Sequence, residues 1–304
     1  MRLWDGPEPW IEAHTSGSTG TPKTIRLLKS DMISSARATN AFFGIGPDSV
    51  LALPLSVDYI AGKMMAVRAR VAGCRLMELP VSNHIELPEG TVVDLLAVVP
   101  SQLPSLVQTP GIAGRVRHLL IGGAPVDDAT ARRVTAAGLD ARLGYGMTET
   151  CSHVALRTLD SPVYTAMPGI TFGVTPDGCL TISSDRFSWR RLETRDVVSL
   201  HGPDAFTWLG RADNTINSGG FKIHPEQVEN TLRRALPWLP PFYIAGRPDS
   251  KWGTTAIMVA ERDARSDDEI LRAVHEALPD SRLCPRRIER VNTLPRTANG
   301  KLRR

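Results

Sequence analysis

The sequence predicts an α/β protein with a large N-terminal α/β domain and a small C-terminal α+β domain. Three observations predict this. Short apolar runs alternate with helix-period patterns through the first two thirds of the chain, which favours a mostly parallel sheet. From about Pro162 the pattern changes to short strands and turns, which predicts a short β segment. After Arg211-Ala-Asp213 a further unit with both helix and strand patterns follows.

In the large domain, expected at residues 1–210, apolar runs of strand length are separated by amphipathic stretches of helix length. The expected strands are Val50–Leu55, Cys74–Leu79, Leu95–Val99 and His118–Ile121, and the expected helices are Ser30–Phe43, Ala61–Ala72 and Asp127–Ala137. The β segment is expected to contain strands at Cys179–Ser183, Val197–Leu200 and Phe206–Leu209.

The small domain is expected at residues 213–304. Pro225 is suited to the first turn of a helix that runs to Leu236. Ser266-Asp-Asp-Glu269 forms a capping-box pattern that opens a second helix. Strands are expected at Phe242–Ala245 and Thr254–Ala260. These elements together predict an α+β module.

The composition excludes several classes of protein. With 42% hydrophobic and 22% charged residues, the 304-residue chain has the composition of a soluble globular protein. The net charge of +4 is concentrated in residues 286–304, which hold seven Lys or Arg and one Glu. No aromatic residue is interleaved with these charges, so nucleic-acid binding is not favoured. No apolar run approaches the roughly 20 residues of a membrane helix.

The four cysteines and the N-terminus indicate the expected location. The cysteines, at positions 74, 151, 179 and 284, are scattered without a CxxC pair, so we expect reduced thiols. The first ten residues lack the pattern of a signal peptide. We therefore expect a cytoplasmic protein; the sequence leaves a homodimer open.

The strongest local signal is the run His14-Thr-Ser-Gly-Ser-Thr-Gly-Thr-Pro-Lys23. Its hydroxyls, glycine backbone amides and lysine are donors suited to phosphate oxygens. The run does not satisfy the Walker A pattern GxxxxGK[ST]. Taken alone, it is also compatible with a flexible turn.

The run resembles the phosphate-binding loop of the adenylate-forming superfamily, which includes acyl-CoA synthetases, peptide-synthetase adenylation domains and luciferases. Further motifs of that superfamily follow in its order. They are Gly122-Gly-Ala-Pro125 after a strand, Gly144-Tyr-Gly-Met-Thr-Glu149, Thr194-Arg-Asp196, Gly210-Arg-Ala-Asp213 with the segment Ile216–Glu229, and Leu294-Pro-Arg-Thr-Ala-Asn-Gly-Lys301.

The resemblance implies a function: activation of a carboxylate as an acyl-AMP with ATP and Mg²⁺, followed by transfer to CoA. It places the adenine against Tyr145, the α-phosphate at Thr148 and the magnesium ion at Glu149. It assigns ribose binding to Asp196 and Arg211. The remaining nucleotide-binding residues that it implies are Thr15, Ser16, Gly17, Ser18, Thr19, Gly20, Lys23, Gly123, Ala124, Pro125, Gly144, Gly146 and Met147.

The resemblance also implies a moving catalytic lysine. The small domain would rotate about Asp213 and withdraw Lys301 after adenylation, while Gly219 and Gly220 would line the route of CoA. An ammonium group delivered to the reacting phosphate stabilises the charge that develops on its oxygens. Lys301 and Thr148 are therefore the expected catalytic residues. Alone, a lysine four residues from the end would be read as part of a solvated tail.

Two stretches resemble the o-succinylbenzoate:CoA ligases of menaquinone biosynthesis, Leu53–Arg68 and Tyr145–Arg157, and Asn217-Ser-Gly-Gly220 also fits that group. A dianionic aromatic keto acid needs a cation and polar donors beside an apolar wall. Lys63, Ser152 and His153 are the candidate polar contacts and Tyr59 the candidate wall. The alternative is that residues 59–68 form only an amphipathic helix.

The chain departs from the superfamily in three respects. The phosphate loop begins at residue 14, so the subdomain that usually precedes it is expected to be absent. Arg195 stands where Gly is usual before the ribose aspartate, and Asn217 where Lys is usual after the hinge. Three alternatives stay open: a ligase for another aryl or fatty acid, a stand-alone adenylating enzyme, and a catalytically silent nucleotide-binding protein.

Overall fold

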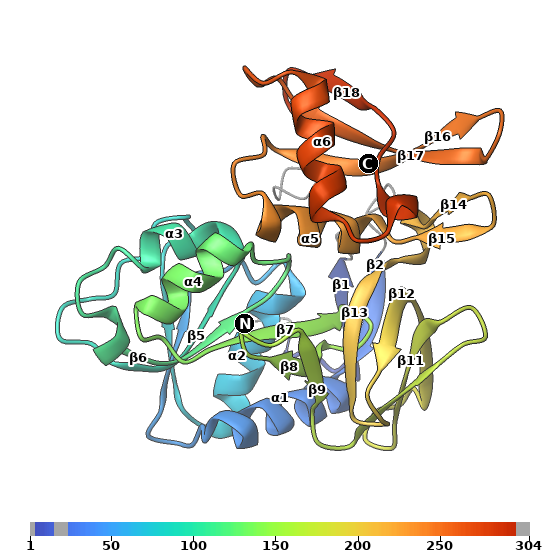
Figure 1. Cartoon of the computed structure of the whole chain (residues 1–304). Coiled ribbons are helices and arrows are strands. Elements are labelled where there is room, and N and C mark those ends of the chain that lie inside the picture. The colour runs from blue at the N-terminus through green and yellow to red at the C-terminus, as the bar shows by residue number, and fades with distance from the viewer. Residues whose placement is uncertain (1–3, 15–23, 296–304) are drawn as a thin grey trace. The chain divides into compact units, whose positions relative to one another are not determined.

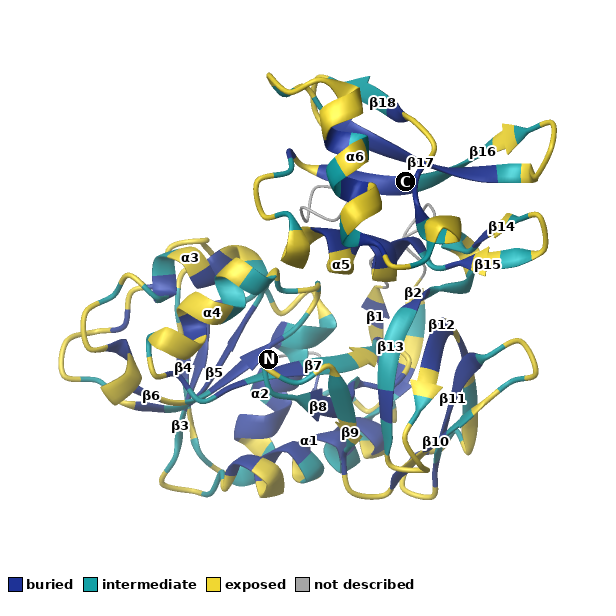
Figure 2. Cartoon of the chain, in the orientation of Figure 1, coloured by how far each residue is buried: buried dark blue, intermediate teal, exposed yellow. Residues whose placement is uncertain are grey.

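The computed structural model describes residues 4–14 and 24–295 (Figure 1). The described residues divide into two compact units. Unit 1 contains the residues up to 173 together with 182–192 and 200–207. Unit 2 contains 174–181, 193–199 and the residues from 208 onward. Each unit has a hydrophobic core of its own, drawn in dark blue in Figure 2.

Unit 1 is built around a continuous β-sheet. Its strands follow the order β9-β8-β7-β6-β5-β3-β4, and residues 205–207 of β13 pair with β9. The pairs from β4 to β7 are parallel, and β7, β8 and β9 pair antiparallel. The strands are β3 (Val50–Leu53), β4 (Arg75–Glu78), β5 (Val93–Val98), β6 (Val116–Ile121), β7 (Ala141–Met147), β8 (Ser152–Arg157) and β9 (Val163–Ala166).

Helices pack against this sheet because its strands are apolar on both faces. Leu96, Val98, Leu119 and Ile121 belong to one core cluster with residues of α3 (Leu103–Leu106) and α4 (Asp128–Ala136). A second cluster joins α1 (Lys29–Phe43) to α2 (Ile60–Ala72). Both of these longer helices end at a glycine in the left-handed conformation, which lacks a side chain that would strain it.

β1 (Trp10–His14) and β2 (Thr24–Leu28), which flank residues 15–23 in the sequence, form a short hairpin. The two strands pair antiparallel, with His14 opposite Thr24. Ile11, Ala13 and Leu27 belong to the same cluster as α1 and α2. The hairpin is thereby anchored to the helices of unit 1.

Unit 2 is an α+β module. β16 (Phe242–Asp249) and β17 (Gly253–Glu261) form an antiparallel pair, and β18 (Ile288–Val291) joins β17 in parallel. Two helices, α5 (Pro225–Ala235) and α6 (Asp267–Ala277), contribute to the core with these strands. A small hairpin, β14 (Ile216–Ser218) and β15 (Phe221–Ile223), precedes α5.

The remaining elements are short or cross between units. β10 (Ile170–Val174), β11 (Cys179–Ser184), β12 (Arg191–Leu200) and β13 (Ala205–Arg211) contain residues assigned to both units. The 3₁₀ turns are η1 (Pro100–Gln102), η2 (Ile112–Gly114), η3 (Ala212–Asn214) and η4 (Ser281–Leu283). Among the described residues, no helix is both long and apolar enough to cross a membrane.

The predicted fold class is confirmed, and every predicted helix and strand is present, although β12 begins at Arg191 rather than at the predicted Val197. Pro225 stands in the first turn of α5, and the capping box of Ser266 and Glu269 closes as predicted. β7 and β8 were not predicted, because glycines interrupt the apolar pattern of β7. The hairpin β14–β15, whose strands have three residues each, was not predicted either. The same holds for the short strands β1, β2, β9, β10 and β18.

Candidate active site

Two of the predicted nucleotide-binding motifs meet at the carboxyl edge of the parallel strands. Gly123-Ala-Pro125 follows β6, and Gly144–Glu149 begins within β7. Because β6 and β7 are parallel neighbours, with Ile121 opposite Leu143, these segments lie side by side. Ligands of open α/β sheets bind at this edge. The fold therefore brings together residues separated by about twenty positions in the sequence.

The turn that follows β7 presents Glu149 to solvent. The hydroxyl of Thr150 accepts a hydrogen bond from the Met147 amide at 3.0 Å, and the amide of Cys151 donates to the Thr148 carbonyl at 3.0 Å. Thr148 and Thr150 are buried, whereas Glu149 between them is exposed. Magnesium bound with a nucleotide takes one or two carboxylates and otherwise phosphate and water oxygens. A single exposed carboxylate at this edge fits that requirement.

The glycines of this motif have a structural reason of their own. A side chain at Gly146 would place its Cβ 2.1 Å from the Ser152 carbonyl oxygen, and one at Gly144 would lie 3.1 Å from the His153 Cβ. Both positions are crowded by β8, which pairs with β7. Glycine is needed at position 146 for the two strands to pair, whether or not a nucleotide approaches, whereas a side chain at position 144 would only crowd His153.

Tyr145, the predicted adenine contact, is half-buried in an aromatic cluster of unit 1. Its ring meets that of Phe206 edge-on at 5.0 Å, and that of Tyr164 at 5.7 Å. Tyr164 also stacks with Phe206, and the Arg157 guanidinium lies 5.4 Å from its ring centre. Edge-to-face contacts of this kind hold an aromatic ring in one orientation.

A buried polar chain connects α2, β8 and α1. The Arg68 guanidinium donates from Nη2 to the Ser152 hydroxyl at 2.9 Å, and Ser152 lies 3.4 Å from His153 Nδ1. His153 Nε2 lies 3.1 Å from the Thr39 hydroxyl, which donates to the Ser35 carbonyl oxygen at 3.1 Å. Because Thr39 has one proton to give, His153 must donate to it from Nε2. The network thus assigns His153 as a neutral imidazole that accepts at Nδ1 from Ser152.

The titration of these groups agrees with that assignment. Burial, with the nearby Arg68 charge, lowers the pKa of His153 well below its ordinary value, so the imidazole is neutral at pH 7. Burial lowers the pKa of Arg68 to about 9, and the guanidinium therefore remains a cation at neutral pH. It is 1% exposed, and its Nε has no hydrogen-bond partner. Among residues 4–14 and 24–295, no carboxylate forms an ion pair with it.

The predicted acid-binding residues separate into two groups. Ser152 and His153 lie together in the polar chain just described. Lys63 instead donates from Nζ to the carbonyl oxygens of Val57 and Asp58, at 2.7 and 3.0 Å, and burial lowers its pKa despite the opposing charge of Asp58. Tyr59, just before α2, is 50% exposed. The cation beside Ser152 is Arg68, which was not among the predicted site residues.

A signal for Arg68 was present in the sequence. It interrupts the run Met64-Met-Ala-Val-Arg-Ala69, most of which is buried. A charged residue at the apolar positions of a helix is rarely buried without a specific role. The predicted helix Ala61–Ala72 is confirmed as α2, and this helix carries the buried cation.

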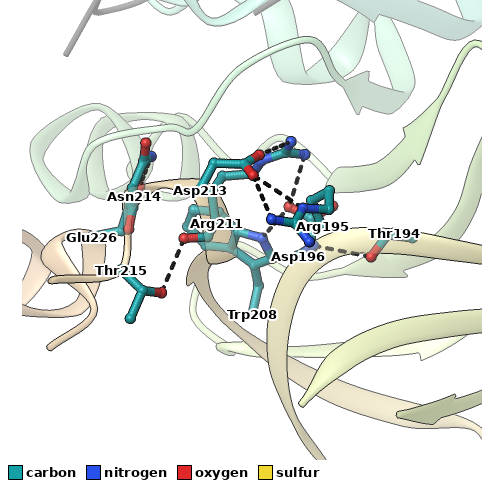
Figure 3. A network of polar contacts seen from close by, with 9 residues as sticks. All are labelled: Thr194, Arg195, Asp196, Trp208, Arg211, Asp213, Asn214, Thr215 and Glu226. Carbon is teal, nitrogen blue, oxygen red and sulfur yellow. Dashed lines mark hydrogen bonds and ion pairs between the residues drawn. The ribbon is translucent and has the colours of Figure 1, made fainter. Parts of the chain in front are cut away.

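The residues predicted to bind the ribose and to form the hinge make a network in unit 2. Asp196 Oδ1 accepts a hydrogen bond from Trp208 Nε1 at 3.0 Å and lies 3.7 Å from Arg211 Nη1. Arg211 also donates to Asp213 Oδ2 at 2.9 Å. The predicted partners Asp196 and Arg211 are therefore adjacent, with Asp213 bound to the second of them, as Figure 3 shows.

The other predicted residues are placed as follows. Gly219 and Gly220 have φ values of 58° and 84° and connect β14 to β15 in a two-residue turn, which explains glycine at both positions. The residues Thr15, Ser16, Gly17, Ser18, Thr19, Gly20, Lys23 and Lys301 lie outside the described residues.

Comparison with known proteins decides the family. The model of the family described as AMP-binding enzyme matches residues 9–176, more than half of the chain. The chain belongs to the AMP-binding enzyme family. A probable 2-succinylbenzoate–CoA ligase of Mycobacterium tuberculosis is 31% identical over 324 residues, covering 95% of this chain and 81% of the relative.

The chain is also similar to two solved structures of acyl-CoA and o-succinylbenzoate–CoA synthetases. An acyl-CoA synthetase (AMP-forming)/AMP-acid ligase II-like protein from Dyadobacter fermentans is 33% identical, with a TM-score of 0.66 over 99% of this chain and 89% of the other. An o-succinylbenzoate CoA synthetase from Bacillus subtilis is 21% identical, with a TM-score of 0.79 over 96% and 67%, and supports the fold alone.

This member of the AMP-binding family is an adenylate-forming acid–CoA ligase. ATP with Mg²⁺, and CoA as the co-substrate, are the partners used by such ligases, as the resemblance predicted. The exposed carboxylate of Glu149 and the motif loops at the carboxyl edge fit a nucleotide with its metal ion. Glu149 would hold that ion through an oxygen ligand.

Substitution of Glu149 by alanine is expected to lower magnesium-dependent adenylation by about 10²-fold while the protein stays folded. The exposed side chain contributes little packing, so its loss removes a ligand rather than a structural contact. Acid-dependent release of pyrophosphate and the melting temperature measure the two effects. Glu89→Ala, at another exposed carboxylate of unit 1, is the control. Full activity of Glu149→Ala, or unfolding, contradicts the assignment.

Proposed function

We propose that this ligase activates o-succinylbenzoate and forms o-succinylbenzoyl-CoA. This is the reaction given in the name of the 31% identical relative, a probable 2-succinylbenzoate–CoA ligase. The observation that carries the proposal is the buried Arg68 guanidinium. A buried cation is costly unless a carboxylate or equivalent acceptor pairs with it. O-succinylbenzoate has two carboxylates, one to be adenylated and a second to be recognised.

The second carboxylate would pair with Arg68 and Ser152. Arg68 already donates to Ser152 through Nη2, and its Nε has no protein partner. A guanidinium binds a carboxylate through two parallel hydrogen bonds, which a lysine cannot provide. Ser152 begins the strand that follows the Glu149 turn, so the acid would lie close to the nucleotide motifs. Lys63, in the first turn of the same helix, and Tyr59, just before that helix, would be outer contacts of the proposed site.

In the proposed reaction the carboxylate oxygen of the succinyl arm attacks the α-phosphorus of ATP and pyrophosphate leaves. Thr148 and Lys301 would stabilise the charge on the phosphate oxygens, and Thr15–Lys23 would hold the departing phosphates. The thiol of CoA then attacks the acyl carbon of the adenylate and AMP leaves. Residues 213–304 are proposed to rotate between these steps about Asp213.

The test is a panel of acids assayed with ATP, magnesium and CoA. O-succinylbenzoate is expected to release AMP and pyrophosphate and to give an aryl-keto-acyl thioester, identified by mass. Turnover of benzoates or fatty acids with none of o-succinylbenzoate would overturn the choice of acid. Absence of pyrophosphate exchange with every acid would point instead to a silent nucleotide-binding protein.

A further inference from the structure

The guanidinium of Arg195, within the motif Thr194-Arg-Asp196, binds Asp213, the residue predicted to be the hinge. Its Nε and Nη2 both donate to Asp213 Oδ1, at 3.0 and 2.8 Å. The other carboxylate oxygen, Oδ2, accepts from Arg211 at 2.9 Å. Two arginines that precede Asp213 in the sequence therefore bind both of its carboxylate oxygens (Figure 3).

The titration of Asp213 supports this arrangement. The hydrogen bond from Arg195 is the largest influence on the Asp213 carboxyl and, together with that from Arg211, lowers its pKa. The carboxylate is thus charged over the whole physiological range. Because Arg211 also lies 3.7 Å from Asp196, the pair predicted to grip the ribose is connected to the hinge through shared charges.

Asn214, the residue after Asp213, is bound to the helix that follows it in the sequence. Asn214 Nδ2 donates to Oε1 of Glu226 at the start of α5, at 2.5 Å. A side chain at Gly210 would place its Cβ 2.5 Å from the same carboxylate, so this contact needs glycine there. Asp213 is tied to the chain before it and Asn214 to the helix after it. Rotation of the backbone between them must therefore strain or break the contacts of Asp213.

We propose that Arg195 is a positioning residue that restrains rotation at Asp213 and so slows the change between the two half-reactions. The inference rests on the proposed function only for its consequence in turnover; the restraint itself is a property of the ligand-free protein. A glycine at position 195 would leave Asp213 with the Arg211 contact only.

The restraint is tested first without substrates. Arg195→Gly is expected to increase amide hydrogen exchange in the peptide that covers residues 205–216 about fivefold, since a networked surface ion pair has about that effect on an opening equilibrium. The η3 turn in this peptide contains the bond from the Thr215 amide to the Ala212 carbonyl. Arg195→Lys, which keeps the charge with a point contact, should give an intermediate rate.

A matched control exists in the same unit. Arg287 and Arg247 share the carboxylate of Glu289 in the way that Arg195 and Arg211 share that of Asp213. Arg287→Gly is expected to leave exchange in residues 205–216 unchanged. Equal exchange in Arg195→Gly and wild type, or equal acceleration by both variants, would overturn the restraint.

The consequence for turnover is measured by rapid quench with ATP, the acid and CoA. In Arg195→Gly the pyrophosphate burst should stay within about twofold of wild type, and either the first thioester turnover or the steady-state rate should rise about fivefold. In about 1 M salt, which weakens exposed ion pairs such as Arg195–Asp213, wild type should approach the variant. A slower burst would mean that Arg195 serves the ribose site instead. If wild type gives no burst with any acid, the proposed function fails, while the exchange experiment still decides the restraint.

Discussion

Arg68→Met is expected to lower kcat/KM for o-succinylbenzoate by about 10²–10³-fold, equivalent to about 3–4 kcal/mol of lost transition-state binding. The buried guanidinium would otherwise pair with a desolvated carboxylate of the acid, and methionine offers only an apolar surface of similar length. The fold should persist, because replacing a buried charge by an apolar side chain is often neutral for stability. Steady-state assays over a range of acid concentrations measure the change.

Two comparisons separate recognition from damage. A benzoate without the second carboxylate, if it is turned over at all, should lose no more than about tenfold in the same variant. Arg70→Met alters an exposed arginine of the same helix that pairs with Asp5, and should behave like wild type. Equal losses with the dianionic and monoanionic acids would show that Arg68 supports the polar chain of Ser152 and His153 rather than the substrate.

Lys301→Ala is expected to separate the two half-reactions. Loss of one donor to a developing oxyanion typically costs about 10²–10³ in rate, so adenylate formation should fall by at least that factor. Transfer from chemically supplied acyl-AMP to CoA needs no such stabilisation of phosphate and should proceed near the wild-type rate. Both half-reactions are to be measured on one preparation of the variant.

The outcome also tests the assigned role of this lysine, which lies outside the described residues. Equal loss in both half-reactions would indicate that Lys301 supports the structure of the C-terminal segment. Equal retention would make it a solvated residue of the tail. Lys222→Ala, at an exposed lysine of β15, is a control for the loss of one positive charge from the C-terminal segment.

The elements of this fold could be predicted because their signals are local. The run Leu95–Val98 within β5 is continuously apolar and buried, and Ser266 with Glu269 marks the start of α6 within four residues. Glycines in strands weaken such signals, and β7, which contains Gly144 and Gly146, was missed for this reason. Its antiparallel partner β8 was missed with it, although both are part of the central sheet.

The sequence by itself determined the fold class, the order of the motifs and the chemistry that they carry, since each motif is contiguous. Only the tertiary structure decided which cation accompanies Ser152. Arg68 donates a hydrogen bond to Ser152, which lies 84 positions away in the sequence. Lys63 instead donates to the Val57 carbonyl oxygen in the loop before its own helix. The tertiary structure also brings the Arg195 guanidinium into hydrogen-bond contact with the Asp213 carboxylate. Such pairings depend on strand register and on the direction in which a helix presents its side chains, and no local pattern of residues encodes either.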